Sequence, residues 1–236
     1  MRTIPKKLTL LHDGEEVLRT KSIEIIEASS DMSAHINMVE TCMDMLHYVY
    51  MNTSEMSKDQ RIVALIGASV FNSMASAFKL MLGGYYQSSG LQIRYIMESG
   101  WLLDYLKTDP KLIQQWKSIP EDKRQKDFGP GLIRDKLDKR DGFKEKKREA
   151  YYKRLCVLCG HPTFAGCSTM LRPKSHLDAH MGPFLVQNLL EQCIQELVRV
   201  SITAGQAFMQ FFPPNTLPDH YLEKQNQWHK HVYGEG

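Results

Sequence analysis

The sequence lacks a long apolar run, both at its start and further along the chain. The first sixteen residues, MRTIPKKLTLLHDGEE, contain only a short apolar segment, which is too little for a secretory signal. The longest stretch without charge runs from Ile62 to Phe78 and includes Asn72 and three serines. We therefore predict a buried core helix there and no membrane span. We expect a cytoplasmic protein without a membrane anchor.

Cysteines are few, and their number is odd. The five cysteines among 236 residues do not form the evenly spaced framework of a disulfide-stabilised protein. A chain of this length buries enough surface to fold without such crosslinks. The cysteine pattern therefore favours a reducing compartment, which agrees with a cytoplasmic location.

Patterns that define several large enzyme classes are also missing. The sequence has no GxSxG elbow, P-loop, HExxH motif or dinucleotide-binding fingerprint. It has no convincing alternation of apolar and polar residues, no internal repeat and no low-complexity tract. Most large enzyme classes are therefore unsupported, and a β-sheet fold is not expected.

What the sequence does contain is helical periodicity along nearly its whole length. We predict a single all-α domain over residues 1–236, a bundle of about six to eight helices. Ser57 and Gln60 have the spacing of a capping box and begin the helix that we expect at the centre of the bundle. A C-terminal tail helix is predicted at about residues 219–232.

A charged excursion, predicted as a helical hairpin insertion at about residues 117–145, interrupts this pattern. Between Lys117 and Arg154 there are fourteen lysines and arginines against eight acidic residues, whereas the rest of the chain is slightly acidic. Clustered cations can indicate an anionic partner such as RNA, because binding releases counterions. A solvated helical hairpin explains the same composition, and we prefer that interpretation.

Arg94 and Glu98 lie four residues apart in a helix that is otherwise apolar. Arg before Glu is the weaker orientation for a helical ion pair, so local helix stability explains the two charges poorly. Two interpretations remain: an internal bridge that ties this helix to its neighbours, or a polar site with a ligand-binding or catalytic role. Both predict that the two side chains face inward.

Three cysteines and a histidine lie close together in the stretch LCVLCGHPTFAGC, at residues 155–167. Cys156 and Cys159 form a CxxC, and His176 and His180 follow at HxxxH spacing, so two thiolates and two imidazoles could bind zinc tetrahedrally. The gap between the two halves is a few residues longer than in a zinc finger. Cysteines three apart on one helix face also behave as small apolar residues. We prefer plain packing and keep zinc as the alternative.

The same stretch offers a metal-independent catalytic pair. Arg154 and His161 are seven residues apart at a predicted helix end. An imidazole can act as acid or base on an RNA 2′-hydroxyl, and a guanidinium can hold the phosphate. The alternative for His161 is a structural histidine that bonds a carbonyl or Glu98.

The helix GGYYQSSGLQIRYIMESGWLLDYL and the later segment YYKRLCVLCGHP resemble uncharacterised bacterial all-helical proteins related in style to HEPN domains. The resemblance covers Gly83 to Pro162. It implies a homodimeric helical bundle, and many such proteins are ribonucleases or toxins in phage defence. Small helix residues usually stand where this chain has Cys156 and Cys159, which argues further against zinc.

We therefore expect a bacterial or phage-related interaction or sensing module in stress or anti-phage defence, with RNA or protein as its partner. Its ligand-binding residues are Arg94, Glu98 and Tyr152, and His161 is expected to join them in one water-poor pocket. The first alternative is a ribonuclease with Arg154 and His161 as catalytic pair. The second is a zinc-stabilised binding module. No cofactor is predicted.

Overall fold

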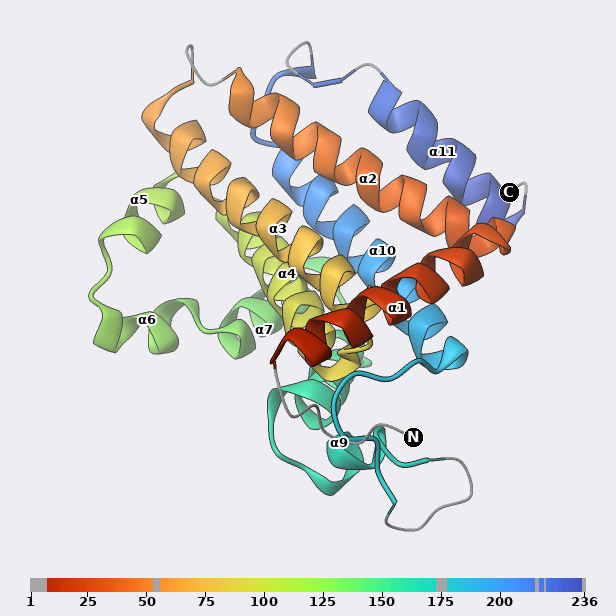
Figure 1. Ribbon diagram of the computed structural model, residues 1–236. Coiled ribbons are helices and arrows are strands. Elements are labelled where there is room, and N and C mark those ends of the chain that lie inside the picture. Colours follow the sequence, from red (N-terminus) through yellow and green to blue (C-terminus); the bar gives the residue numbers. More distant parts are fainter. Residues whose placement is uncertain (1–7, 53–55, 173–177, 215–216, 219, 235–236) are drawn as a thin grey trace.

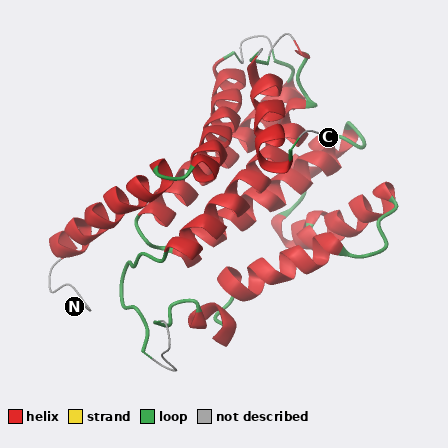
Figure 2. Ribbon diagram, turned by 90° about the vertical axis from the view of Figure 1, so that its right-hand side faces the viewer, coloured by secondary structure: helices red, strands yellow, loops and turns green. Residues whose placement is uncertain are grey.

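The structure is a computed structural model, and it describes residues 8–52, 56–172, 178–214, 217–218 and 220–234. The predicted all-α class is confirmed: the described chain folds into helices joined by loops (Figures 1 and 2). The helices are α1 (Leu8–Glu27), α2 (Ser30–Met51), α3 (Lys58–Leu82), α4 (Tyr86–Leu106), α5 (Lys111–Ser118), α6 (Glu121–Phe128), α7 (Pro130–Asp141), α8 (Lys147–Leu155), α9 (Phe164–Ser168), α10 (Gln187–Met209) and α11 (His220–Tyr233).

The predicted capping box at the start of α3 is confirmed. The Ser57 hydroxyl accepts a hydrogen bond from the Gln60 amide at 3.2 Å, and the Gln60 side chain accepts one from the Ser57 amide at 3.0 Å. The helix then packs against α2, α4 and α10, and its inward residues Val63, Val70 and Met74 are fully buried. The prediction of a central helix is therefore correct. By length and composition alone, α3 could span a membrane, and the core helix of a soluble protein meets the same test.

Small residues let α4 and α10 approach each other closely. A Cβ atom on Gly100 of α4 would lie 3.1 Å from the Cα atom of Ala204 on α10. The two helices cross the centre of the molecule beside α3, and their facing residues are almost all buried (Figure 1). This contact fixes the relative positions of α4 and α10, the two long helices between which the candidate site lies.

The charged excursion at 117–145 covers α6, α7 and the turn before α8. Its helix α7 lies against α4, where Ile133 and Leu137 are buried. Arg140 donates two hydrogen bonds to the Asp104 carboxylate of α4, at 2.7 and 2.9 Å. Arg148 bridges Asp138 and Asp141. Arg140 and Arg148 are thus held in ion pairs with carboxylates of α4 and α7.

The C-terminal helix α11 packs along α2 (Figure 1). Tyr221 is 1% exposed, and its hydroxyl lies 3.9 Å from the sulfur of Cys42. Trp228 and His231 add polar contacts to α2 further along the helix. The tail helix predicted at about 219–232 therefore exists and docks on the body, with residue 219 outside the described residues.

Candidate functional site

The segment that continues α8 is a π-helix, Cys156–Gly160. Its last turn closes when the His161 amide donates to the Cys156 carbonyl five residues back, at 2.9 Å. Isolated π turns are frequent at functional sites, because they rotate the side chains of a helix out of the α-helical register. The cysteine-rich stretch is therefore a helix end of unusual geometry, and it forms one wall of the site.

Two glycines let this π-helix press against α4. A Cβ atom on Gly90 would lie 2.1 Å from the sulfur of Cys159, and one on Gly160 would lie 2.3 Å from Nη1 of Arg94. In this arrangement neither Gly90 nor Gly160 has room for a Cβ atom. Cys159 of the π-helix therefore packs against Gly90 of α4, and Arg94 of α4 packs against Gly160 of the π-helix.

The described candidate zinc ligands of this segment do not come together at one point. Cys156 is buried, Cys159 is half-buried against Gly90, and the His180 ring stacks on Phe184 with centroids 4.6 Å apart. Within the described chain, no group of three or more metal-ligating side chains comes together. His176 lies outside the described residues. Cys156 and Cys159 lie in the contact between the π-helix and α4, whereas Cys167 is exposed.

Arg94 and Glu98 form the expected pair, with Nε and Oε1 2.8 Å apart and both side chains about a quarter exposed. The Arg94 guanidinium also lies over the Tyr152 ring, 5.3 Å from its centroid. Burial acts to lower the pKa of Arg94, but the hydrogen bond and charge of Glu98 outweigh it and raise that pKa. Burial and the Glu98 charge raise the pKa of Tyr152. The structure thus brings three of the predicted ligand-binding residues together.

His161 does not join them, so the prediction of one water-poor pocket shared with Arg94 and Glu98 is wrong. Its side chain is exposed, and its imidazole makes no hydrogen bond or ion pair with the described part of the chain. The reason is local: the π turn places Gly160 against Arg94, and the backbone then becomes extended at His161, with φ −135° and ψ 152°. The backbone therefore turns away from Arg94 directly after Gly160, and the His161 side chain does not reach Arg94 or Glu98.

Arg154 also points away from Arg94, toward α10. It forms an ion pair with Glu196, and its guanidinium lies 5.4 Å from the centroid of the Tyr151 ring. The Tyr151 hydroxyl donates to the second oxygen of Glu196 at 2.5 Å, and Arg199 approaches the same oxygen at 3.6 Å. Burial and the hydrogen bond to Glu196 raise the pKa of Tyr151. One carboxylate therefore holds a tyrosine and two guanidinium groups.

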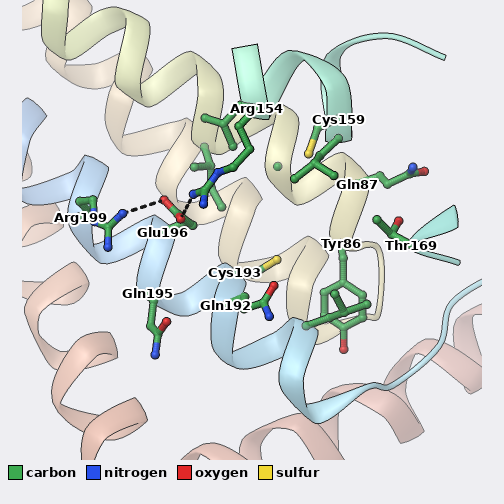
Figure 3. A pocket seen from close by; sticks show the side chains of 15 residues that line it. Tyr86, Gln87, Arg154, Cys159, Thr169, Gln192, Cys193, Gln195, Glu196 and Arg199 are labelled. Atoms are coloured by element: carbon green, nitrogen blue, oxygen red, sulfur yellow. Dashed lines mark hydrogen bonds and ion pairs between the residues drawn. The ribbon is translucent and has the colours of Figure 1, made fainter. Parts of the chain in front are cut away.

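This cluster stands at the edge of a cavity of about 440 Å³ between α4, the π-helix and α10 (Figure 3). Its walls include the apolar side chains of Ile93, Leu155, Leu158 and Leu189. Figure 3 shows Arg154 and Glu196 near one end and Tyr86 near the other.

The thiols in the wall of the cavity are those of Cys159 and Cys193. Burial raises the pKa of Cys193 to about 12 and also raises that of Cys159. Both sulfurs are thus protonated near neutral pH and behave as weakly polar wall groups.

The sequence analysis missed the α10 half of this site. Glu196 is one of two acidic residues between Gln187 and Met209, and it follows the buried Ile194 and precedes the buried Leu197. A charge next to apolar positions of a helix was the available signal, the same one that identified Arg94 and Glu98. Cys193 gave no comparable signal, because its place in the cavity wall depends on which helix faces it.

Comparison with known proteins adds no relative. No protein-family model matches the sequence, and neither the curated proteins nor the solved structures contain a significant match. The site therefore has to be interpreted from its own geometry.

Proposed function

We propose that the chain is a helical sensing module whose cavity between α4, the π-helix and α10 binds a small molecule with an apolar body and an anionic group. The cavity itself carries this proposal. Its volume of about 440 Å³ falls within the range of small-molecule sites, which are typically apolar concavities with a few placed polar groups.

The anionic preference follows from the charges at the cavity edge. Arg154 and Arg199 contribute two guanidinium groups, and Glu196 contributes one carboxylate. Arg154 uses only one of its nitrogens to bond Glu196, so its other donors remain available to a ligand. A carboxylate or phosphate group could therefore bind Arg154 while the bridge to Glu196 stays intact.

The residues that line the cavity favour a sensing role over a catalytic one, because they come from separate helices. The cavity joins residues from α4, the π-helix and α10, which are distant in sequence. A ligand that contacts all three would stabilise their relative positions, which is the physical basis of a conformational response. The cavity wall offers protonated thiols and no unpaired imidazole as a base.

A fluorescent probe tests the proposal. The dye 8-anilinonaphthalene-1-sulfonate combines an aromatic body with one anionic group. We expect saturable binding of one dye to the folded chain. Cys193→Phe, which fills the cavity, should weaken binding at least roughly tenfold, and Arg154→Gln should weaken it by a similar factor.

Val157→Phe is the matched control. Val157 lies on the same π-helix, is 42% exposed and does not line the cavity. This variant should bind the dye as the wild type does. Unchanged binding by Cys193→Phe would contradict the proposal, and so would binding that appears only when near-ultraviolet circular dichroism is lost, because loosely packed states also bind this dye.

We extend the proposal to the fold type, subunit number and biological role of the chain. The resemblance over Gly83 to Pro162 supports a HEPN-like homodimer in stress or phage defence, with an RNA or protein partner. The two segments that carry the resemblance are in contact, because the π-helix packs against α4. This contact is consistent with the proposed HEPN-like bundle. Light scattering on the purified chain measures the subunit number, and a monomer at all concentrations would remove the homodimer.

A further inference from the structure

Another cavity lies between α4, α5, α6 and α7, away from the site described above. Its volume is about 480 Å³, which falls within the range of small-molecule sites. Figure 1 shows α5 and α6 extending from the body of the molecule beside α7. No residue lines both this cavity and the one between α4, the π-helix and α10, so the two are separate.

Part of the cavity wall is aromatic and aliphatic. The rings of Tyr105 and Phe128 have centroids 6.1 Å apart, and both residues are buried. Leu112 and Ile119 are half-buried against the core, and Leu132 is 36% exposed. An apolar group of a ligand can therefore leave water between these side chains.

Lys136 and Tyr105 together present hydrogen-bond donors to this cavity. The Lys136 ammonium donates to the Tyr105 hydroxyl, with the nitrogen and the oxygen 2.6 Å apart, and its two other hydrogens remain. The hydroxyl hydrogen has no acceptor among the residues that the structure describes, and Lys136 has no ion-pair partner among them. A carboxylate accepts strong hydrogen bonds from both kinds of group, so an anion fits here.

A carboxylate without a partner lines the same cavity. Asp127, in the last turn of α6, is exposed and forms no hydrogen bond or ion pair with the described part of the chain, Lys136 included. A negative charge in the last turn opposes the helix dipole, so the stability of α6 does not explain this residue. Two opposite charges thus border one cavity without pairing, and each is left to a ligand.

We propose that this cavity binds a free α-amino acid with an apolar side chain. The carboxylate of the amino acid bonds the Lys136 ammonium and the Tyr105 hydroxyl, and its ammonium group pairs with Asp127. Its side chain lies against Phe128 and Ile119. An α-amino acid carries both charges beside one apolar group, which matches the composition of the wall. The proposal neither requires nor supports the function proposed for the other cavity.

The first test compares ligands by isothermal titration calorimetry on the whole chain at pH 7.5. We expect saturable binding of one L-phenylalanine to each chain. The analogue 3-phenylpropanoate lacks the ammonium group, 2-phenylethylamine lacks the carboxylate, and glycine lacks the apolar side chain. Each of the three should bind at least roughly tenfold more weakly than phenylalanine, because each loses one of the three contacts.

Variants assign each charge of the ligand to one residue. Asp127→Asn should bind phenylalanine at least roughly tenfold more weakly but should bind 3-phenylpropanoate as tightly as the wild type does. Lys136→Met should weaken phenylalanine binding by a similar factor and leave the binding of 2-phenylethylamine unchanged. A merely structural role of either residue would weaken all ligands alike.

The chain offers matched controls on the same two helices. Asp122→Asn in α6 and Lys139→Met in α7 each remove one exposed charge that does not line the cavity. Both variants should bind phenylalanine as the wild type does. Cys193→Phe, which fills the other cavity, should also leave phenylalanine binding unchanged.

Three results would overturn the proposal. The first is the absence of saturable phenylalanine binding by the wild type. The second is binding of 3-phenylpropanoate or 2-phenylethylamine as tight as that of phenylalanine, which would show that one charge is sufficient. The third is undiminished phenylalanine binding in Asp127→Asn or Lys136→Met, or its loss in Cys193→Phe, because the amino acid would then bind elsewhere.

Discussion

Trp228 of α11 donates a hydrogen bond from its indole nitrogen to Nδ1 of His35 on α2, with the two nitrogens 3.0 Å apart. An indole N–H can only donate, so Nδ1 must carry a lone pair and His35 must be neutral. The imidazole is 7% exposed, and burial lowers its pKa, against the opposing charges of Asp31 and Glu191. His231, on the same helix as Trp228, acts in the same direction as burial. The docking of α11 thus depends on an uncharged histidine.

We predict that acid loosens α11. Because the folded-state pKa of His35 lies below its unfolded value near 6.5, the unfolded or undocked chain binds more protons between these two values. The contribution of His35 is complete above about pH 6.5 and is lost as the pH falls through the lowered pKa. Hydrogen exchange of the α11 amides between pH 7.5 and 5 measures the effect, after correction for the intrinsic exchange rate.

His35→Gln is the control for this prediction. A glutamine oxygen can still accept from Trp228 but does not titrate, so the protection of α11 in this variant should vary little over the same range. Equal pH dependence in the variant and the wild type would show that another group controls docking, such as the pair of His231 with Asp31.

The second prediction concerns the carboxylate at the cavity edge. Glu196→Gln leaves Arg154, Arg199 and the partly buried Tyr151 hydroxyl with a neutral acceptor, so we expect a loss of about 1–3 kcal/mol in the free energy of unfolding. Tyr151→Phe removes one of these bonds and should have a smaller effect. Urea titration measures both, and an equal or larger loss in Tyr151→Phe would assign the stability to the tyrosine itself.

The third prediction uses the close contact between α4 and the π-helix. Gly90→Ala places a methyl group where the sulfur of Cys159 lies, so it should destabilise the fold by roughly 1–3 kcal/mol. Cys159→Ala removes that sulfur and should recover most of the loss when the two changes are combined. A double-mutant cycle of unfolding free energies gives the coupling, and strictly additive effects would contradict the contact.

The fourth prediction separates catalysis from stability at His161. Because its imidazole is exposed and makes no bond with the described residues, His161→Ala should change the free energy of unfolding by less than about 0.5 kcal/mol. RNA cleavage that persists in EDTA and disappears in this stable variant would support the ribonuclease alternative. Cleavage that is unchanged in the variant would remove it.

Local patterns in the sequence were enough for much of the fold. The periodicity of the apolar residues predicted helices, and the spacing of Ser57 and Gln60 located the start of α3. The tail helix followed from the same kind of pattern. These features depend on contacts within a few residues, which a single sequence displays directly.

The site was harder to predict because it depends on contacts between distant segments. The pair of Arg94 and Glu98 was visible as two charges on an apolar helix, but the direction of His161 was set by a π turn that periodicity does not reveal. Whether Glu196 meets Arg154 depends on how α10 packs beside α8.

The π-helix at Cys156–Gly160 also has an evolutionary meaning. A π turn corresponds to one residue inserted into an α-helix, and each residue of an α-helix turns the chain by about 100°. A homologue without that insertion would continue α8 in regular register, so Gly160 and Arg94 could no longer face each other across the same contact. Ancestral or related sequences that differ by one residue in this segment would therefore differ in the whole wall that the segment gives to the cavity.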